Sequence, residues 1–136
     1  MYQALQGNIG LGKAIEYFTS QCLTVSLPLN DTQGYDLVVD FDGVLSRVQV
    51  KTSRNKQSSG SFEVLLKRSG GASGKHRIKL FDKTSCDHLF VYTSDGRMYL
   101  IPTTAVDSTS SIKVGSKYAE YEVRTRTFGE FAEAAV

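Results

Sequence analysis

Residues 35–52 read YDLVVDFDGVLSRVQVKT, and this stretch decides the fold. Two valine-rich runs flank Asp42-Gly43, a dipeptide typical of a two-residue turn, so the stretch predicts a β-hairpin. With these turn residues, Phe41 faces Val44, and the same register places Asp36 directly opposite Gln49. Lys51 follows two residues after Gln49 and therefore projects from the same face of the sheet.

The two faces of this hairpin differ in chemistry. One face is mainly apolar and suits a core; it carries Leu37, Val39, Phe41, Val44, Val48 and Val50. The outward face gathers a carboxylate, an amide and an ammonium group at one end, on Asp36, Gln49 and Lys51. Oxygen ligands suit Mg²⁺, so Asp36 and Gln49 are candidate metal ligands, and Lys51 is a candidate for orienting water and offsetting phosphate charge. The alternative is an ordinary solvated strand face.

Positive charge is concentrated in one part of the chain. Residues 51–83 hold nine Lys and Arg against two acidic residues, a net charge of +7, which leaves −5 for the rest of a chain with a formal charge of +2. A basic segment of this kind is typical of contacts with a phosphate backbone, although a lysine-rich face kept for solubility is the alternative. The basic residues that we expect to contact nucleic acid are Arg54, Lys56, Arg68, Lys75, Arg77 and Lys79.

The remaining periodicity predicts a mixed α/β fold. Helices are expected over residues 7–22 and 128–136, and strands over residues 23–27, 35–41, 44–52, 62–67, 89–94, 97–102 and 118–124. These elements suggest a central, largely antiparallel sheet with at least two helices. With 136 residues and no evident linker or repeat, the chain is expected to form a single domain over residues 1–136.

Several other classes of protein do not fit the sequence. No apolar run is long enough to span a membrane, and the first residues lack a signal-peptide pattern, so we expect a cytoplasmic protein with Cys22 and Cys86 as free thiols. The segment from Gly7 to Lys13 matches the GxxxxGK pattern of nucleotide-binding loops. However, Ala14 stands where a hydroxyl would bind magnesium, and no buried strand precedes the first glycine.

The hairpin residues also carry a resemblance to a known family. Asp36 followed by Gln49, Val50 and Lys51 resembles the PD-(D/E)xK nuclease motif in its variant form with Gln in the second acidic position. The stretches GNIG (7–10), VSLPLND (25–31), YDLVVD (35–40), RVQVKT (47–52), FDKTSCD (81–87) and YLIP (99–102) resemble the intron-associated homing endonuclease branch of this superfamily, which is related to Holliday junction resolvases.

The resemblance implies a restriction-endonuclease-like core, a central mixed β-sheet flanked by helices. It also implies Mg²⁺-dependent hydrolysis of phosphodiester bonds in double-stranded DNA by a homo-oligomer, either a dimer or a tetramer. Asp36 and Gln49 would then bind the metal, with the Val50 carbonyl as a further ligand, and Lys51 would be the catalytic lysine.

One position departs from the family pattern. The family usually has a Glu on the first helix near position 11, where this chain has Leu11 and Gly12. The nearest acidic residue on this helix is Glu16, which is a doubtful replacement because five residues rotate it away from the Leu11 direction. Two alternatives therefore stay open: a catalytically weakened DNA-binding module of the same fold, and a resolvase specific for Holliday junctions.

Overall fold

The computed structural model describes residues 1–70 and 77–135. The helices are α1 (Tyr2–Ser20) and α2 (Phe128–Ala134), with the 3-10 turns η2 (Thr103–Ala105) and η3 (Ala119–Tyr121). The strands are β1 (Thr24–Ser26), β2 (Leu37–Phe41), β3 (Val44–Ser53), β4 (Asn55–Lys56), β5 (Phe62–Leu65), β6 (Arg68–Gly70), β7 (Arg77–Lys79), β8 (His88–Thr93), β9 (Met98–Pro102), β10 (Ser111–Val114) and β11 (Glu122–Val123).

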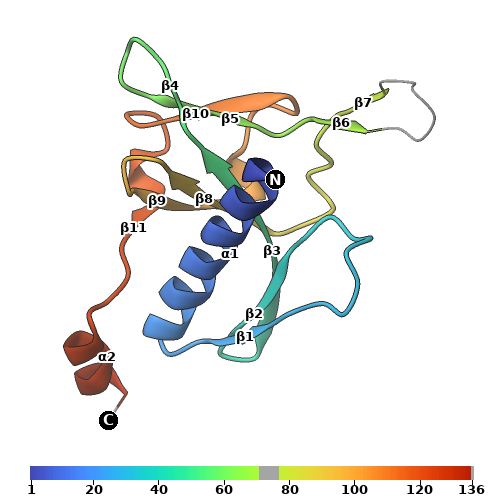
Figure 1. Cartoon of the computed structure of the whole chain (residues 1–136). Coiled ribbons are helices and arrows are strands. Elements are labelled where there is room, and N and C mark those ends of the chain that lie inside the picture. The colour runs from blue at the N-terminus through green and yellow to red at the C-terminus, as the bar shows by residue number, and fades with distance from the viewer. Residues whose placement is uncertain (71–76, 136) are drawn as a thin grey trace.

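A six-stranded sheet forms the centre of the molecule, in the order β1-β2-β3-β8-β9-β11 (Figure 1). The pairing of β3 with β8 is parallel and the other pairings in this sheet are antiparallel, so the sheet is mixed. The predicted hairpin register is confirmed, because Phe41 pairs with Val44 and Leu37 with Val48. The predicted α/β class is confirmed as well.

Helix α1 packs on one face of this sheet. Its buried residues Ala14 and Phe18 contact a core that includes Leu37, Val39 and Val48, the apolar face predicted for the hairpin. The helix runs from Tyr2 to Ser20 rather than over residues 7–22, so the predicted start is wrong by five residues. The GxxxxGK segment therefore lies within a helix and forms no phosphate-binding loop.

The close approach of α1 to β3 explains one of these glycines. A Cβ atom added at Gly10 would lie 2.4 Å from Thr52 Cγ2 and 3.2 Å from Val50 Cγ1. No side chain larger than hydrogen fits at this distance without a shift. Gly10 therefore allows the helix axis to lie close to the strand that carries Gln49 and Lys51.

A second sheet covers part of the opposite face of the central sheet. It has three strands in the order β10-β5-β4, and its residues Phe62, Val64 and Ile112 share a core with Leu89 and Val91 of the central sheet. The remaining two strands, β6 and β7, form a separate hairpin that extends away from both sheets (Figure 1). The sequence analysis missed β10, β4, β6 and β7.

The C-terminal part of the chain differs from the prediction in one segment. Residues 118–124 were expected to form a strand, but only β11 is extended, because Tyr118 has a φ of 66° and is followed by η3. Helix α2 confirms the predicted terminal helix, and its N-terminus is closed by a capping box between Thr127 and Glu130. No helix in the described part of the chain is both long enough and apolar enough to cross a membrane.

Candidate active site

The hairpin register brings Asp36 and Gln49 into contact. The strand register ends with the pair Leu37 and Val48, and the backbone N–H of Asp36 also donates to the Val48 carbonyl at 2.8 Å, so Asp36 lies just before the first paired residue of β2. Gln49 Nε2 then donates to Asp36 Oδ2 at 3.0 Å, and the N–H of Val50 donates to the same oxygen at 2.8 Å. Asp36 therefore lies opposite Gln49, as the turn residues predict.

These contacts leave several oxygen atoms available at the N-terminal end of β2. Among the described residues, no hydrogen bond reaches Asp36 Oδ1, and Gln49 uses its nitrogen rather than its oxygen for the contact with Asp36. In a strand, the N–H and C=O of one residue point to the same side. The N–H of Val50 points to Asp36, so the Val50 carbonyl points to the same edge of β3. This part of the edge lies beyond the N-terminal end of β2.

Lys51 extends from the next position of β3 on this face. With Gln49, it lines a cavity of about 120 Å³, to which Arg68, Lys79 and Asp82 also contribute. Burial lowers the pKa of the Lys51 ammonium group; the Asp36 carboxylate opposes this effect and the Arg68 guanidinium adds to it. The site thus places a partly desolvated cation beside the oxygen atoms of Asp36 and Gln49.

The environment of this face differs from a solvated strand face. In the parallel pairing, Gln49 and Lys51 lie beside Leu89 and Val91, which are fully buried. Leu66 and Phe81 line the same cavity as Lys51. Leu66, which follows β5, and the segment around Phe81 therefore cover the Lys51 side chain, and the expectation of an open outward face is wrong at this position.

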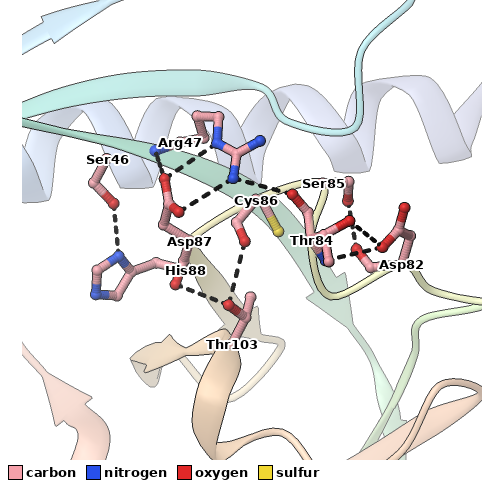
Figure 2. Close-up of polar contacts among 9 residues, drawn as sticks. All are labelled: Ser46, Arg47, Asp82, Thr84, Ser85, Cys86, Asp87, His88 and Thr103. Carbon is pink, nitrogen blue, oxygen red and sulfur yellow. Dashed lines mark hydrogen bonds and ion pairs between the residues drawn. The ribbon is translucent and has the colours of Figure 1, made fainter.

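A polar network holds the segment 82–87 against β3 (Figure 2). The Arg47 guanidinium contacts both oxygens of Asp87, with Nε to Oδ2 and Nη2 to Oδ1 each at 3.2 Å, and the backbone N–H of Arg47 donates to Oδ2 at 2.8 Å. Arg47 Nη2 also donates to the Thr84 carbonyl at 3.0 Å. These bonds to Arg47 lower the pKa of Asp87.

The same segment forms one wall of the cavity. Asp82 Oδ1 accepts from the N–H and the hydroxyl of Thr84, a turn that fixes Asp82 at the cavity edge. On the other side, a Cβ atom at Gly34 would lie 2.7 Å from Ser85 Cβ, so the segment packs directly on the loop before Asp36. Arg47 and Asp87 therefore position this wall. The sequence analysis did not identify this role, although the Asp-x-Thr pattern at 82–84 is a recognisable turn signal.

Leu11, at the first-helix position where the family usually has a Glu, lies near the site. Leu11 lines a cavity of about 240 Å³ together with Asp36 and Asp31. Glu16, the doubtful candidate, instead lines a groove between α1 and α2 with Ile15. The structure thus brings an apolar side chain to the side of Asp36 and places Glu16 in a different cavity.

The predicted DNA-contacting residues lie in separate places. Arg54 and Lys56 are exposed around β4, whereas Arg68 and Lys79 reach the cavity of Lys51. Lys75 lies outside the described residues, and for Arg77 the structure describes the backbone pairing in β7.

The donor atoms suit a hard divalent cation. The described residues contain no group of three His, Cys, Asp or Glu side chains able to hold a metal ion. The Asp36 carboxylate nevertheless contacts the Gln49 amide and the Val50 backbone at the N-terminal end of β2, so each of these three residues has an oxygen atom in this neighbourhood that could serve as a ligand. This oxygen set fits Mg²⁺ or a similar ion that retains several water ligands, rather than zinc, which prefers nitrogen and sulfur.

The fold is of the restriction-endonuclease type, a mixed central sheet flanked by helices, and sequence comparison agrees. The family model described as PD-(D/E)XK endonuclease matches residues 1–133, and the chain belongs to this family. The structure is similar to that of the bacterial homing endonuclease I-Ssp6803I, with a TM-score of 0.71 and 25% sequence identity over 97% of this chain and 89% of the other. Among curated proteins, no sequence matches the chain.

Proposed function

We propose that the protein is a Mg²⁺-dependent endonuclease that hydrolyses phosphodiester bonds in double-stranded DNA. The observation that carries this proposal is the contact of the Asp36 carboxylate with the Gln49 amide at one end of a single hairpin, where Gln49 also shares a cavity with Lys51. Membership of an endonuclease family and similarity to a bacterial homing endonuclease support it.

Each residue of the hairpin has a distinct role in this reaction. Asp36, Gln49 and the Val50 carbonyl would hold the metal, which, when bound, polarises the phosphate and lowers the pKa of coordinated water. The N–H of Val50 and the Gln49 amide fix the orientation of the Asp36 carboxylate through its Oδ2 atom. Because both groups bind Oδ2, the Oδ1 atom of Asp36 remains available to the metal.

Lys51 acts on the phosphate and on the attacking water. Its ammonium group is partly desolvated, so its attraction to charge that develops on the phosphate oxygens is stronger than in bulk water. Its place beside Gln49 in the cavity also suits a role in orienting the attacking water.

The basic segment 51–83 would hold the DNA. We propose that Arg54, Lys56, Arg68, Lys75, Arg77 and Lys79 contact the phosphate backbone. Each neutralised phosphate releases counterions, so binding would weaken steeply with salt. Because each chain has one site of this kind, cutting both strands requires two chains, and we propose a homo-oligomer with two-fold symmetry.

The test is Lys51→Ala, with Lys67→Ala as the matched control. Lys67 is exposed and does not line the cavity, so its replacement removes the same charge outside the site. We expect Lys51→Ala to lower the single-turnover cleavage rate in Mg²⁺ by about 10²- to 10³-fold while DNA binding remains largely intact. Undiminished cutting by Lys51→Ala would overturn the assignment.

The Leu11 side chain beside Asp36 favours one second candidate, a catalytically weakened DNA-binding module. Binding of duplex DNA without nicking in either Mg²⁺ or Mn²⁺ would support this candidate against the endonuclease. The same assay includes a four-way junction, since preferential cutting of the junction would indicate a resolvase instead.

A further inference from the structure

The β6–β7 hairpin brings two cations to the candidate active site. Arg68 and Lys79 are cross-strand partners in this hairpin, and both side chains line the cavity that contains Gln49 and Lys51. The hairpin follows β3 in the sequence after β4 and β5, and it contributes Arg68 and Lys79 to the cavity lining. The strand that carries the catalytic lysine and the hairpin therefore share one cavity.

The charges in this cavity are unbalanced. Among the described residues, no ion pair involves Lys51, Arg68 or Lys79. The cavity has one carboxylate, that of Asp82, and its Oδ1 atom already accepts two hydrogen bonds from Thr84. Arg68 and Lys79 are like charges on cross-strand neighbours, an arrangement that destabilises a hairpin. With Lys51 they make three cations against two nearby carboxylates, those of Asp82 and Asp36, so a bound anion would reduce the repulsion.

The geometry points to a phosphate group as this anion. The cavity of about 120 Å³ is small, polar and accessible, and its other side is formed by the edge that carries Gln49. A guanidinium group binds two oxygens of one phosphate, whereas an ammonium group contributes a compact charge. Arg68 and Lys79 together can therefore contact several oxygens of a single phosphate that Lys51 also reaches.

We propose that Arg68, Lys79 and Lys51 bind one and the same phosphate group, the phosphate that is hydrolysed. This inference rests on the proposed endonuclease function and changes the role of the hairpin. Arg68 and Lys79 stabilise the charge that accumulates on the reacting phosphate, whereas Arg54 and Lys56, on a different part of the surface, contribute to overall affinity for DNA.

The test compares Arg68→Gln and Lys79→Gln with Lys67→Gln. Lys67 precedes Arg68 and is exposed, but it does not line the cavity, so this control removes a neighbouring charge. At saturating DNA, we expect Arg68→Gln and Lys79→Gln to lower the single-turnover rate by about 10- to 100-fold, whereas Lys67→Gln retains it. Arg68→Lys should recover only part of the rate, because the ammonium group loses the two-point contact.

Cleavage rates that stay at the wild-type value for Arg68→Gln and Lys79→Gln at saturating DNA, with a change in Kd alone, would overturn the proposal. A second measurement needs no cleavage: the thermal stability of the protein in increasing inorganic phosphate. We expect phosphate to raise the Tm of the wild type and of Lys67→Gln more than that of Arg68→Gln or Lys79→Gln. Equal stabilisation of all four proteins would refute the phosphate site, whether or not the protein cuts DNA.

Discussion

Replacement of Gly10 by alanine tests the contact between α1 and the strand that carries the active site. In an exposed helix position, Gly→Ala stabilises a protein by about 0.8–1.0 kcal/mol. At Gly10, however, the new Cβ would lie 2.4 Å from Thr52 Cγ2, so either the side chain of Thr52 or the helix must move. Overpacking of this kind costs about 1–3 kcal/mol.

Rotation of the Thr52 side chain carries a further cost. Thr52 Oγ1 accepts a hydrogen bond from Gln6 Nε2 at 2.9 Å, and a different rotamer of Thr52 would break it. A bond of this type contributes about 0.5–1.5 kcal/mol. After the gain in helix propensity is subtracted, we expect Gly10→Ala to lower the free energy of unfolding by about 2 kcal/mol.

Gly12→Ala is the matched control for this prediction. No atom lies within 4 Å of a Cβ atom added at Gly12, so this variant should gain about 0.5–1 kcal/mol. Urea unfolding followed by circular dichroism measures both free energies, and the two variants should differ by about 2–3 kcal/mol. If Gly10→Ala is stabilised as much as Gly12→Ala, α1 does not lie against β3 as described.

Three further predictions concern the site and the C-terminal helix. Leu11→Glu should add a carboxylate to the cavity next to the metal ligands and tighten binding of Mn²⁺ about tenfold, equivalent to about 1.4 kcal/mol, by calorimetric titration. Arg47→Ala should cost about 1 kcal/mol at pH 7. The bonds to Arg47 lower the pKa of Asp87, so the difference from wild type should persist into mildly acid solution and shrink only as the pH falls far enough to protonate Asp87 in the wild type as well. The Arg124 ion pair and the helix cap lower the pKa of Glu130 to about 2, so α2 should stay capped at pH 3 in the wild type. Glu130→Gln should increase the amide exchange of α2 at pH 7.

Each of these predictions has an outcome that contradicts it. Leu5→Glu makes the same change on α1 away from Asp36, and an equal gain in metal affinity there would show that position 11 is not special. A stability difference between Arg47→Ala and wild type that stays the same from pH 7 down to acid pH would mean that Asp87 is not held by Arg47. A Glu130 side chain that titrates near its ordinary value of 4.5 in an NMR experiment would disprove the capped arrangement of α2.

The active-site hairpin could be predicted because its information is local. The turn dipeptide at 42–43 fixes the register, and the alternation of apolar residues fixes which face is buried, so Asp36, Gln49 and Lys51 follow from one short stretch. The position of Leu11 near Asp36 also follows from the family pattern. The start of α1 could not be predicted, because in the sequence a glycine that allows close packing inside a helix looks the same as a glycine at a helix terminus.

The surroundings of the hairpin depend on contacts between distant parts of the chain. The parallel partner of β3 follows it by more than 30 residues, and no local pattern indicates which strand this is. For the same reason, the enclosure of Lys51 by Leu66 and Phe81 could not be inferred from residues 35–52. The prediction of a strand over residues 118–124 is wrong because Tyr118 has a positive φ, which an extended strand does not allow. A tertiary contact accompanies this conformation, with the Tyr118 hydroxyl donating to Asp107 at 3.1 Å.

The parallel pairing of β3 with β8 has a consequence for the order of folding. The proposed metal-binding and catalytic residues Asp36, Gln49 and Lys51 lie on or next to β2 and β3, whose mutual contacts are short-range in sequence, whereas the β3–β8 pairing closes a loop over residues 54–87. Loops of that length close more slowly than a hairpin forms. We therefore expect amide protons of β2 and β3 to become protected first in pulsed hydrogen-exchange labelling. The metal ligands would then be assembled before the phosphate cavity exists, so a chain that is still folding could bind a cation but not yet position a phosphate for hydrolysis.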